Sequence, residues 1–197
     1  MRSIHSLLIT TLFLNLIIAS CGSPSPKVIN DLSNASYQLV NQDGQKVTFP
    51  GDFKGHPMIT GYIFTNCNGV CPAITANMKK ISDRLCDNSN LQFVGISFDP
   101  MRDTPEVLKQ YMRKFELDSS CFTYLTGDSA EVYALLDRIG IRTKMVPDTN
   151  KAGGLDDYSF NHTNQINLFD SRGRIRGEYG GSMTPPRLIA EDLNKLK

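Results

Sequence analysis

The sequence predicts an α/β domain with a central mixed sheet, helices on both faces of that sheet and an N-terminal β-hairpin. Short apolar runs alternate with segments whose apolar residues recur at helical spacing, which is typical of a parallel sheet covered by helices. Near the C-terminus, the turn at residues 170–173 separates two more apolar runs and predicts antiparallel strands. Roughly 160 residues follow the N-terminal segment, enough for one domain with its own core.

The first half of the domain alternates strand and helix. We expect a hairpin over residues 37–49 that turns at Asp43–Gly44. Strands are expected over residues 57–65, 91–98 and 122–125, each followed by a helix.

Helix-start signals and the C-terminal elements complete the pattern. Thr104 before Pro105 is typical of a helix start, and Asp128 with Glu131 resembles a capping box for a helix that ends at Gly140. We then expect a long loop over residues 143–157, strands over 165–169 and 174–179, and a last helix after Thr184. This order is the outline of a thioredoxin-like domain.

The N-terminal segment has the features of an export signal. Arg2 gives a positive start, and the apolar run that follows is too short to span a membrane. Small residues then lead to Cys21, which resembles a bacterial lipobox whose cysteine is lipidated. The alternative is an ordinary signal peptide with a cysteine near its cleavage site. We favour the lipoprotein, because a Gly/Ser/Pro-rich linker follows Cys21 directly.

The expected segments are a signal peptide over residues 1–20, a tether over 21–35 and the thioredoxin-like domain over 36–197. The protein would be exported and lipid-anchored to a bacterial membrane, facing the periplasm or the cell exterior, where disulfides persist. Removing residues 1–20 removes one basic residue, Arg2, and leaves 20 basic and 20 acidic groups. A net charge near zero gives no indication of a nucleic-acid partner.

Two cysteines, Cys67 and Cys71, lie at a predicted turn between a strand and a helix. Asn68–Gly69 permits a sharp turn, and Pro72 is tolerated in the first helical turn. A helix N-terminus stabilises thiolates, and residues four apart lie about 6 Å from each other, within disulfide range. The pair can therefore cycle between dithiol and disulfide or bind a soft ion such as Cu(I).

A metal site needs a third donor, and histidine is the usual one. His56 lies in a polar turn, and we interpret it as a surface residue. His162 lies just before the strand expected over residues 165–169. In a thioredoxin-like sheet, the loop before that strand faces the cysteine turn. This position favours His162 as a ligand over a loop histidine without a role.

Three stretches of the chain occur together in one known family. They are the Cys67–Pro72 motif, the segment Ser97–Pro105, and Asn161–Thr163 with Asp170 and Gly173 beyond it. In these motifs the chain resembles the SCO/SenC family of copper-binding, thioredoxin-like proteins, which assist assembly of the dinuclear copper centre of cytochrome c oxidase. The resemblance runs from about Tyr37 to the C-terminus.

The resemblance implies a copper metallochaperone in which Cys67, Cys71 and His162 bind Cu(I), Cu(II) or both. Its implied partners are an apo cytochrome c oxidase copper-site subunit, other copper chaperones or thiol reductants, and the membrane that holds the lipid anchor. Asn68–Gly69 replaces the family's proline-aspartate, and Asn161 replaces its aspartate before the histidine. The missing carboxylate could change the orientation of His162 or the affinity of the site.

An enzyme is the alternative function: a thiol–disulfide oxidoreductase that uses Cys67 and Cys71 to reduce the cysteines of a copper-site partner. The three-residue gap between the cysteines differs from the two-residue gap of ordinary thioredoxin motifs, and a pure reductase has no need of His162. A third reading is a lipoprotein binding module in which the cysteines form a structural bridge only.

We assign structural roles to the two remaining cysteines and to three charged residues. Cys86 ends the first predicted helix and Cys121 precedes a strand, so we predict a structural disulfide between them, with two free thiols as the alternative. Asp99, Arg102 and Asp103 follow a strand at the sheet's carboxyl edge. We favour local capping and ion pairing for these three over direct ligation.

Overall fold

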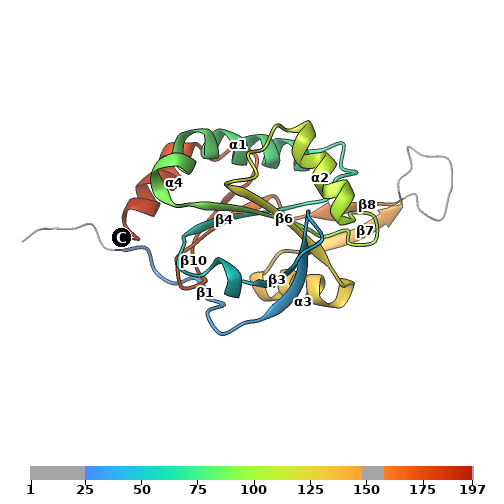
Figure 1. Ribbon diagram of the computed structural model, residues 1–197, viewed down its shortest axis with the longest axis horizontal. Helices are drawn as coiled ribbons and strands as arrows, with labels where there is room; N and C mark the ends of the chain where they lie inside the picture. Colours follow the sequence, from blue (N-terminus) through green and yellow to red (C-terminus); the bar gives the residue numbers. More distant parts are fainter. Residues whose placement is uncertain (1–24, 148–157, 197) are drawn as a thin grey trace, which may run out of the picture.

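One eight-stranded mixed sheet organises the chain (Figure 1). The computed structural model describes residues 25–147 and 158–196, and the expected signal peptide and Cys21 lie outside the described residues. The strand order is β1-β10-β9-β4-β5-β6-β2-β3. In chain order the strands are β1 (Asn30–Asp31), β2 (Tyr37–Asn41), β3 (Lys46–Phe49), β4 (Met58–Ile63), β5 (Gln92–Ser97), β6 (Phe122–Gly127), β9 (Gln165–Phe169) and β10 (Arg174–Gly180).

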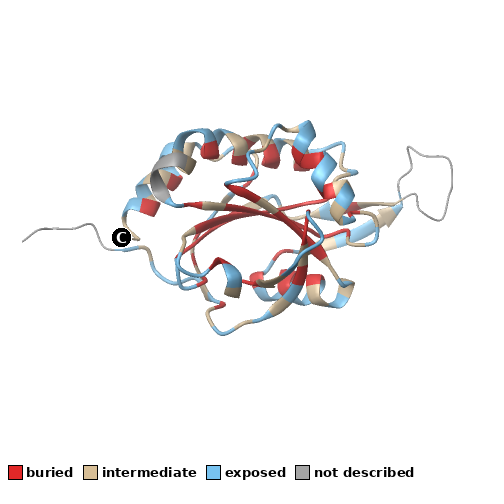
Figure 2. Ribbon diagram, viewed as in Figure 1, coloured by how far each residue is buried: buried red, intermediate tan, exposed pale blue. Residues whose placement is uncertain are grey.

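The sheet is parallel at its centre and antiparallel at its sides. β4 pairs with β5 and β5 with β6 in parallel, whereas β9, β10, β2 and β3 pair antiparallel with their neighbours. All six residues of β4 are buried, and buried residues follow the central strands in Figure 2. The predicted mixed sheet, N-terminal hairpin and alternation of strand and helix are confirmed.

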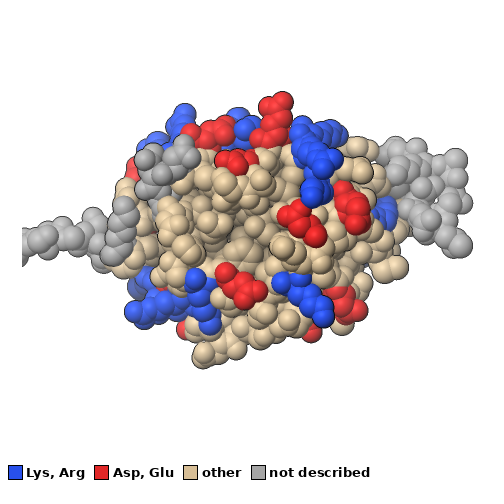
Figure 3. All heavy atoms as spheres, viewed as in Figure 1, with Lys and Arg blue, Asp and Glu red and all other residues tan. Residues whose placement is uncertain are grey.

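Helices cover both faces of the sheet. α1 (Val70–Ser89), α2 (Pro105–Lys114) and α4 (Pro186–Asn194) lie on one face, and α3 (Ser129–Ile139) lies on the other (Figure 1). A short 3-10 helix, η1 (Gly51–Phe53), follows the hairpin. This is the thioredoxin-like architecture expected from the sequence. On the face drawn in Figure 3, acidic and basic side chains are interspersed.

Two helices begin where their sequence signals predict. The Thr104 side chain accepts a hydrogen bond from the Val107 N–H, and Pro105 occupies the first turn of α2. The Asp128 carboxylate caps α3 by accepting from the Ala130 N–H. Glu131 instead accepts a hydrogen bond from the Gln38 N–H, so it ties α3 to β2.

Part of the expected loop over residues 143–157 is a strand. β7 (Thr143–Pro147) pairs antiparallel with β8 (Tyr158–His162) in a separate two-stranded sheet. Thr143 and Val146 favour extended structure, but a five-residue strand whose partner lies outside the main sheet leaves little periodicity to detect. The rest of the expected loop, residues 148–157, lies outside the described residues.

Part of the expected tether packs on the domain. β1 pairs antiparallel with β10, and the Leu32 side chain next to it is fully buried. A two-residue strand that pairs with a segment far along the chain has no local signature, which explains why the sequence did not indicate it. In the described part of the chain, no helix is long and apolar enough to cross a membrane.

Candidate metal centre

The end of β4 and the start of α1 position the two cysteines. Gly69 is the residue before α1, and no side chain caps the helix there. Its N–H points instead at the Cys67 sulfur, with 3.3 Å between N and Sγ. Cys67 is half-buried and Cys71, in the first turn of α1, is fully buried. The helix start therefore directs backbone donors at sulfur, where they stabilise a thiolate.

His162 reaches the cysteines from β8, where it is the last residue of the strand. The sequence places it in a loop, and this detail is wrong. Its Nε2 lies 3.4 Å from the Cys71 Sγ, and its Nδ1 lies 3.0 Å from the Thr163 carbonyl oxygen. In the metal-free site, an Nε2–H donates toward the cysteine thiolate. A proton on Nδ1 instead, donated to the Thr163 carbonyl, leaves the Nε2 lone pair directed at the thiols. This is the tautomer that a metal ligand needs.

Aromatic side chains hold the His162 ring in place. The centroids of the Phe98 and Phe64 rings lie 4.7 Å and 6.2 Å from that of His162. Phe160 packs on both phenylalanines, with centroid distances of 5.3 Å. Rings packed in this way restrict the rotation of the imidazole, so that Nε2 stays directed at Cys71.

The three ligand atoms lie close enough to share one ion. The sulfurs of Cys67 and Cys71 and a ring nitrogen of His162 all lie within 4.8 Å of one another. Among the described residues, no other three cysteine, histidine or carboxylate side chains are grouped so that they could hold one metal ion. Donors about 2.0–2.3 Å from a common metal in a plane would be about 3.5–4 Å apart, so small movements would complete the site. Two thiolates and one imidazole suit copper.

The two thiols differ in acidity. A hydrogen bond with Cys71 is the main cause that lowers the pKa of Cys67, and His162 and the backbone of Cys71 and Gly69 act in the same direction. The hydrogen bond with the Cys67 thiolate and burial raise the pKa of Cys71. The metal-free pair therefore holds one thiolate and one thiol, and binding a metal to both sulfurs would release a proton.

The site opens into a pocket of about 410 Å³. Its lining includes Cys67 and His162 together with residues from the β4–α1 turn and β8, namely Asn66, Asn68, Gly69, Val70, Ser159, Phe160 and Asn161. Cys67 is half-buried and Asn161 is exposed, so a partner can reach the ligands from solvent. Asn161, the residue before His162, is part of this lining.

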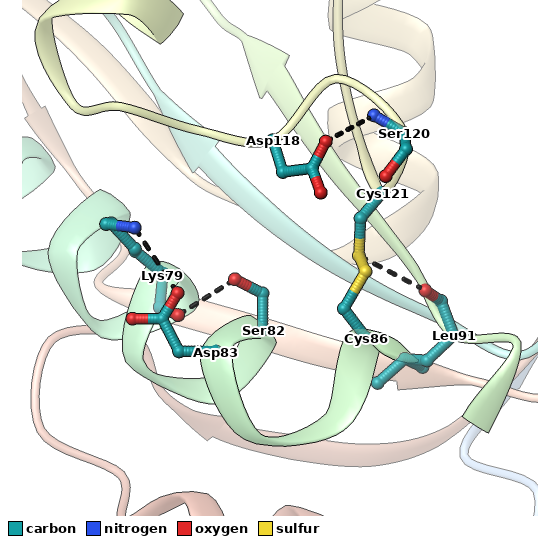
Figure 4. The surroundings of a disulfide bond; sticks show 8 residues. All are labelled: Lys79, Ser82, Asp83, Cys86, Leu91, Asp118, Ser120 and Cys121. Carbon is teal, nitrogen blue, oxygen red and sulfur yellow. Dashed lines mark hydrogen bonds and ion pairs between the residues drawn. A yellow bond between two sulfur atoms is a disulfide. The ribbon is translucent and has the colours of Figure 1, made fainter. Parts of the chain in front are cut away.

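The other cysteines form a disulfide at the far end of α1. The sulfurs of Cys86 and Cys121 are 2.02 Å apart, and the bond joins the last turns of α1 to the start of β6 (Figure 4). Cys86 lies 15 positions after Cys71, or about 22 Å along the helix. The bridge is therefore separate from the metal centre.

Charged residues near the centre pair with one another. Asp99 forms an ion pair with Arg102, and Asp103 accepts hydrogen bonds from Thr65 and Ser97. None of the three belongs to the group of possible ligands in the described residues. His56 lies in the turn before β4 and does not line the pocket. Tyr158, which contacts Asp99 and Arg102, was not singled out from the sequence, and no motif there indicates it.

Comparison with known proteins relates this arrangement to a family. A family model described as SCO1/SenC matches residues 28–197. The "SCO1 protein homolog" of Bacillus subtilis is 30% identical over 115 residues, which cover 58% of this chain and 59% of that protein. This chain spans 59–66% of the length of the first three curated relatives that it matches.

Solved structures agree with the family match. A SCO1/SenC family lipoprotein from Bacillus anthracis is 30% identical with a TM-score of 0.71, over 82% of this chain and 92% of that one. ScoI of Bradyrhizobium japonicum, solved with copper bound, is 30% identical with a TM-score of 0.65, over 82% of this chain and 98% of that one. The described fold is therefore shared with these proteins.

Proposed function

Because the chain belongs to the SCO1/SenC family, we propose that it binds copper through Cys67, Cys71 and His162 and delivers it during assembly of the dinuclear copper centre of cytochrome c oxidase. The observation that carries the proposal is the meeting of two sulfurs and an imidazole nitrogen within 4.8 Å. The copper-bound relative from Bradyrhizobium japonicum supports the choice of metal.

The donor set suits both oxidation states of copper. Thiolates are soft ligands that favour Cu(I), and an imidazole helps to accommodate Cu(II). Cys67 is half-buried at the pocket, so a partner's ligand can reach the metal while Cys71 and His162 still hold it. Copper would then pass to an apo-oxidase subunit, or arrive from another chaperone, by exchange of ligands one at a time.

The proposed cell location is outside the cytoplasm. We propose a signal peptide over residues 1–20, lipidation at Cys21, a tether that begins there and a membrane-anchored copper-binding domain. The Cys86–Cys121 disulfide supports an oxidising compartment. Arg176 of β10 donates a hydrogen bond to the Ser25 hydroxyl, and its neighbour Ile175 pairs with Phe169, at the end of β9 away from His162. An anchor before Ser25 would therefore leave the metal pocket facing away from the membrane.

The test is copper binding by the full chain, purified in detergent and reduced. We expect one copper per chain and a sulfur-to-copper charge-transfer band that is lost in Cys67→Ala and shifted in His162→Ala. His56→Ala is the matched control, because His56 does not line the pocket, and it should behave as wild type. Wild-type protein without stoichiometric copper would overturn the proposal. Transfer of the bound copper to an apo-oxidase copper-site domain tests the delivery step.

One observation favours a second function, thiol–disulfide reduction. The accessible Cys67 has a lowered pKa and the buried Cys71 a raised one, as in an attacking and a resolving thiol. The Cys67 thiolate would attack a partner's disulfide and Cys71 would then resolve the mixed disulfide, leaving the partner reduced and this pair oxidised. An external thiol reductant would restore the pair. Reductase turnover that is unaffected by His162→Ala, in a protein without copper, would favour this function.

A further inference from the structure

The turn between β5 and α2 contacts both chain segments that carry the proposed copper ligands. Cys67 lies in the β4–α1 turn, Cys71 lies in the first turn of α1, and His162 lies at the end of β8. β8 belongs to the separate two-stranded sheet, so the ladder of the main sheet does not fix its position. Contacts outside the main ladder, in addition to the phenylalanine rings around His162, therefore help to set the distance between the histidine and the thiols.

Asp103 holds the cysteine side. Its carboxylate accepts hydrogen bonds from the Thr65 N–H, at 3.0 Å, and from the Thr65 hydroxyl, at 2.6 Å. Asp103 is fully buried, and Thr65 lies two residues before Cys67. A buried carboxylate with several donors is costly to disturb, so this contact fixes the start of the cysteine turn.

Asp99 and Arg102 hold the histidine side. The Tyr158 hydroxyl donates to the Asp99 carboxylate at 2.7 Å, and the Arg102 guanidinium donates to the Tyr158 carbonyl at 3.0 Å. The guanidinium also lies 3.6 Å from the centre of the Tyr158 ring and forms an ion pair with Asp99. Tyr158 is the first residue of β8 and His162 its last, so these contacts place one end of the strand whose other end carries the histidine.

Ser97 joins the two sides. Its hydroxyl donates to the Asp103 carboxylate and accepts from the Asp99 N–H at 3.0 Å. A continuous chain of hydrogen bonds therefore runs from the cysteine turn to β8. It consists of Thr65, Asp103, Ser97, Asp99 and Tyr158, and with Arg102 we name these residues the brace.

We propose that the brace is a positioning device that holds His162 at the thiols and thereby sets the affinity of the centre for Cu(II). The inference rests on the proposed copper function and adds residues that act through His162 without touching the metal. Burial and the hydrogen bond to Asp99 raise the pKa of Tyr158 to about 12, so its hydroxyl remains a donor at neutral pH. The soft thiolates contribute most to Cu(I) binding and the imidazole contributes more to Cu(II) binding, so loosening β8 affects Cu(II) most.

The first test is Tyr158→Phe in the full chain, with Cu(II) and Cu(I) affinities measured by competition with chelators. We expect Cu(II) binding to weaken about 10-fold, the lower end of the range for loss of a group that hydrogen-bonds a ligand directly, because Tyr158 acts on His162 through β8. Cu(I) binding should change by less than about 3-fold, and the Cu(II) electron paramagnetic resonance spectrum should shift. Tyr179→Phe is the matched control, because it also removes a tyrosine–carboxylate hydrogen bond, at 2.9 Å to Asp192 and outside the pocket lining.

A double variant separates positioning from a general loss of stability. If Tyr158 acts through His162, then Tyr158→Phe has no further effect on Cu(II) affinity in a His162→Ala background. Arg102→Lys, which keeps the charge and loses the planar stacked group, should weaken Cu(II) binding in the same selective way.

The outcomes distinguish the brace from the function on which it rests. Wild-type protein that binds no copper would overturn both. If the wild-type protein binds copper and Tyr158→Phe has the same Cu(II) affinity, the proposed role of the brace is wrong and the copper function stands. The same loss in the His162→Ala background would also overturn it, because the effect would then not pass through the histidine.

Discussion

The Sγ of Cys71 lies 3.4 Å from the Nε2 of His162, although 91 positions separate the two residues in the sequence. Cys71 is placed by the start of α1, and His162 by a strand outside the main sheet. Two segments that are far apart in the sequence, the start of α1 and the end of β8, are thus in contact through the Cys71 sulfur. The consequences for the acidity of the thiols can be measured without any metal.

Cys67 should be the reactive thiol of the reduced, metal-free protein. Only the thiolate reacts with iodoacetamide, and the hydrogen bond from Cys71 lowers the pKa of Cys67. A lowered pKa keeps Cys67 reactive at pH 6, where an ordinary thiol is protonated. Mass spectrometry of peptides alkylated at pH 6 should show label on Cys67 and little on Cys71, whose pKa is raised. Equal labelling of both at that pH contradicts the prediction.

The control for this experiment is His162→Ala. His162 contributes to the lowered pKa of Cys67, so its loss should slow alkylation of Cys67 at pH 6 by a few-fold. His56→Ala should leave the rate unchanged, because His56 is outside the pocket.

Local signals account for the parts of the centre that the sequence predicted. The cysteine turn is marked by Asn68–Gly69 and by the apolar strand before it, so its place at a helix start follows from neighbouring residues. His162 was selected by its position before β9 and does lie at the thiols, although in a strand. Tyr158 could not be found in this way. It binds Asp99 from 59 positions away, and nothing near either residue specifies the other.

The disulfide should stabilise the domain without affecting the metal centre. It closes a loop with a sequence separation of 35, for which chain entropy gives about 3–4 kcal/mol. The double variant Cys86→Ala/Cys121→Ala should therefore lose about that much free energy of unfolding in urea, with Cu(I) affinity within about 3-fold of wild type. A large loss of copper affinity would show that the bridge positions the start of α1 as well. Thiol counting of the unreduced wild-type protein checks that the bond is present.

Gly95 should not tolerate a methyl group. It lies on β5 directly opposite Tyr124 of β6, and a Cβ at Gly95 would come within 2.3 Å of the Tyr124 ring. That ring is fully buried, and its hydroxyl hydrogen-bonds the Thr75 side chain in α1 at 3.3 Å, so it has little freedom to move. We expect Gly95→Ala to lower the free energy of unfolding by about 1–3 kcal/mol, measured by urea denaturation.

The matched control for this substitution is Gly140→Ala. Gly140 has open space around its Cβ position but a positive φ of 86°. Gly140→Ala should lower the free energy of unfolding by about 1 kcal/mol, and this loss should come from backbone strain alone. The two variants should also differ at the copper site: Gly95→Ala disturbs a ring that contacts α1, whereas Gly140→Ala should leave Cu(I) affinity unchanged. Gly95→Ala with wild-type stability would contradict the close approach of the ring.

Asp170 should make stability fall in acid. Burial alone would raise the pKa of Asp170, but hydrogen bonds from Arg174 and Arg176 and from the Arg172 and Arg174 N–H groups outweigh it, so the net shift is downward. The Arg176 and Arg174 side chains donate at 2.8 Å and 2.9 Å. A folded-state pKa below the unfolded value of about 3.9 stabilises the protein above that pH. This contribution is lost as pH falls through the folded pKa.

Asp170→Asn should therefore have a pH-dependent cost. At pH 7 we expect it to lower the free energy of unfolding by about 1–2 kcal/mol, because two charged hydrogen bonds are lost. The difference from wild type should shrink between pH 4 and pH 3, measured by urea denaturation at each pH. Asp83→Asn is the matched control, since the Asp83 side chain is 56% exposed and its pair with Lys79 is a surface contact that contributes little. A cost for Asp170→Asn that stays constant down to pH 3 would mean that the folded protein does not lower the pKa of Asp170.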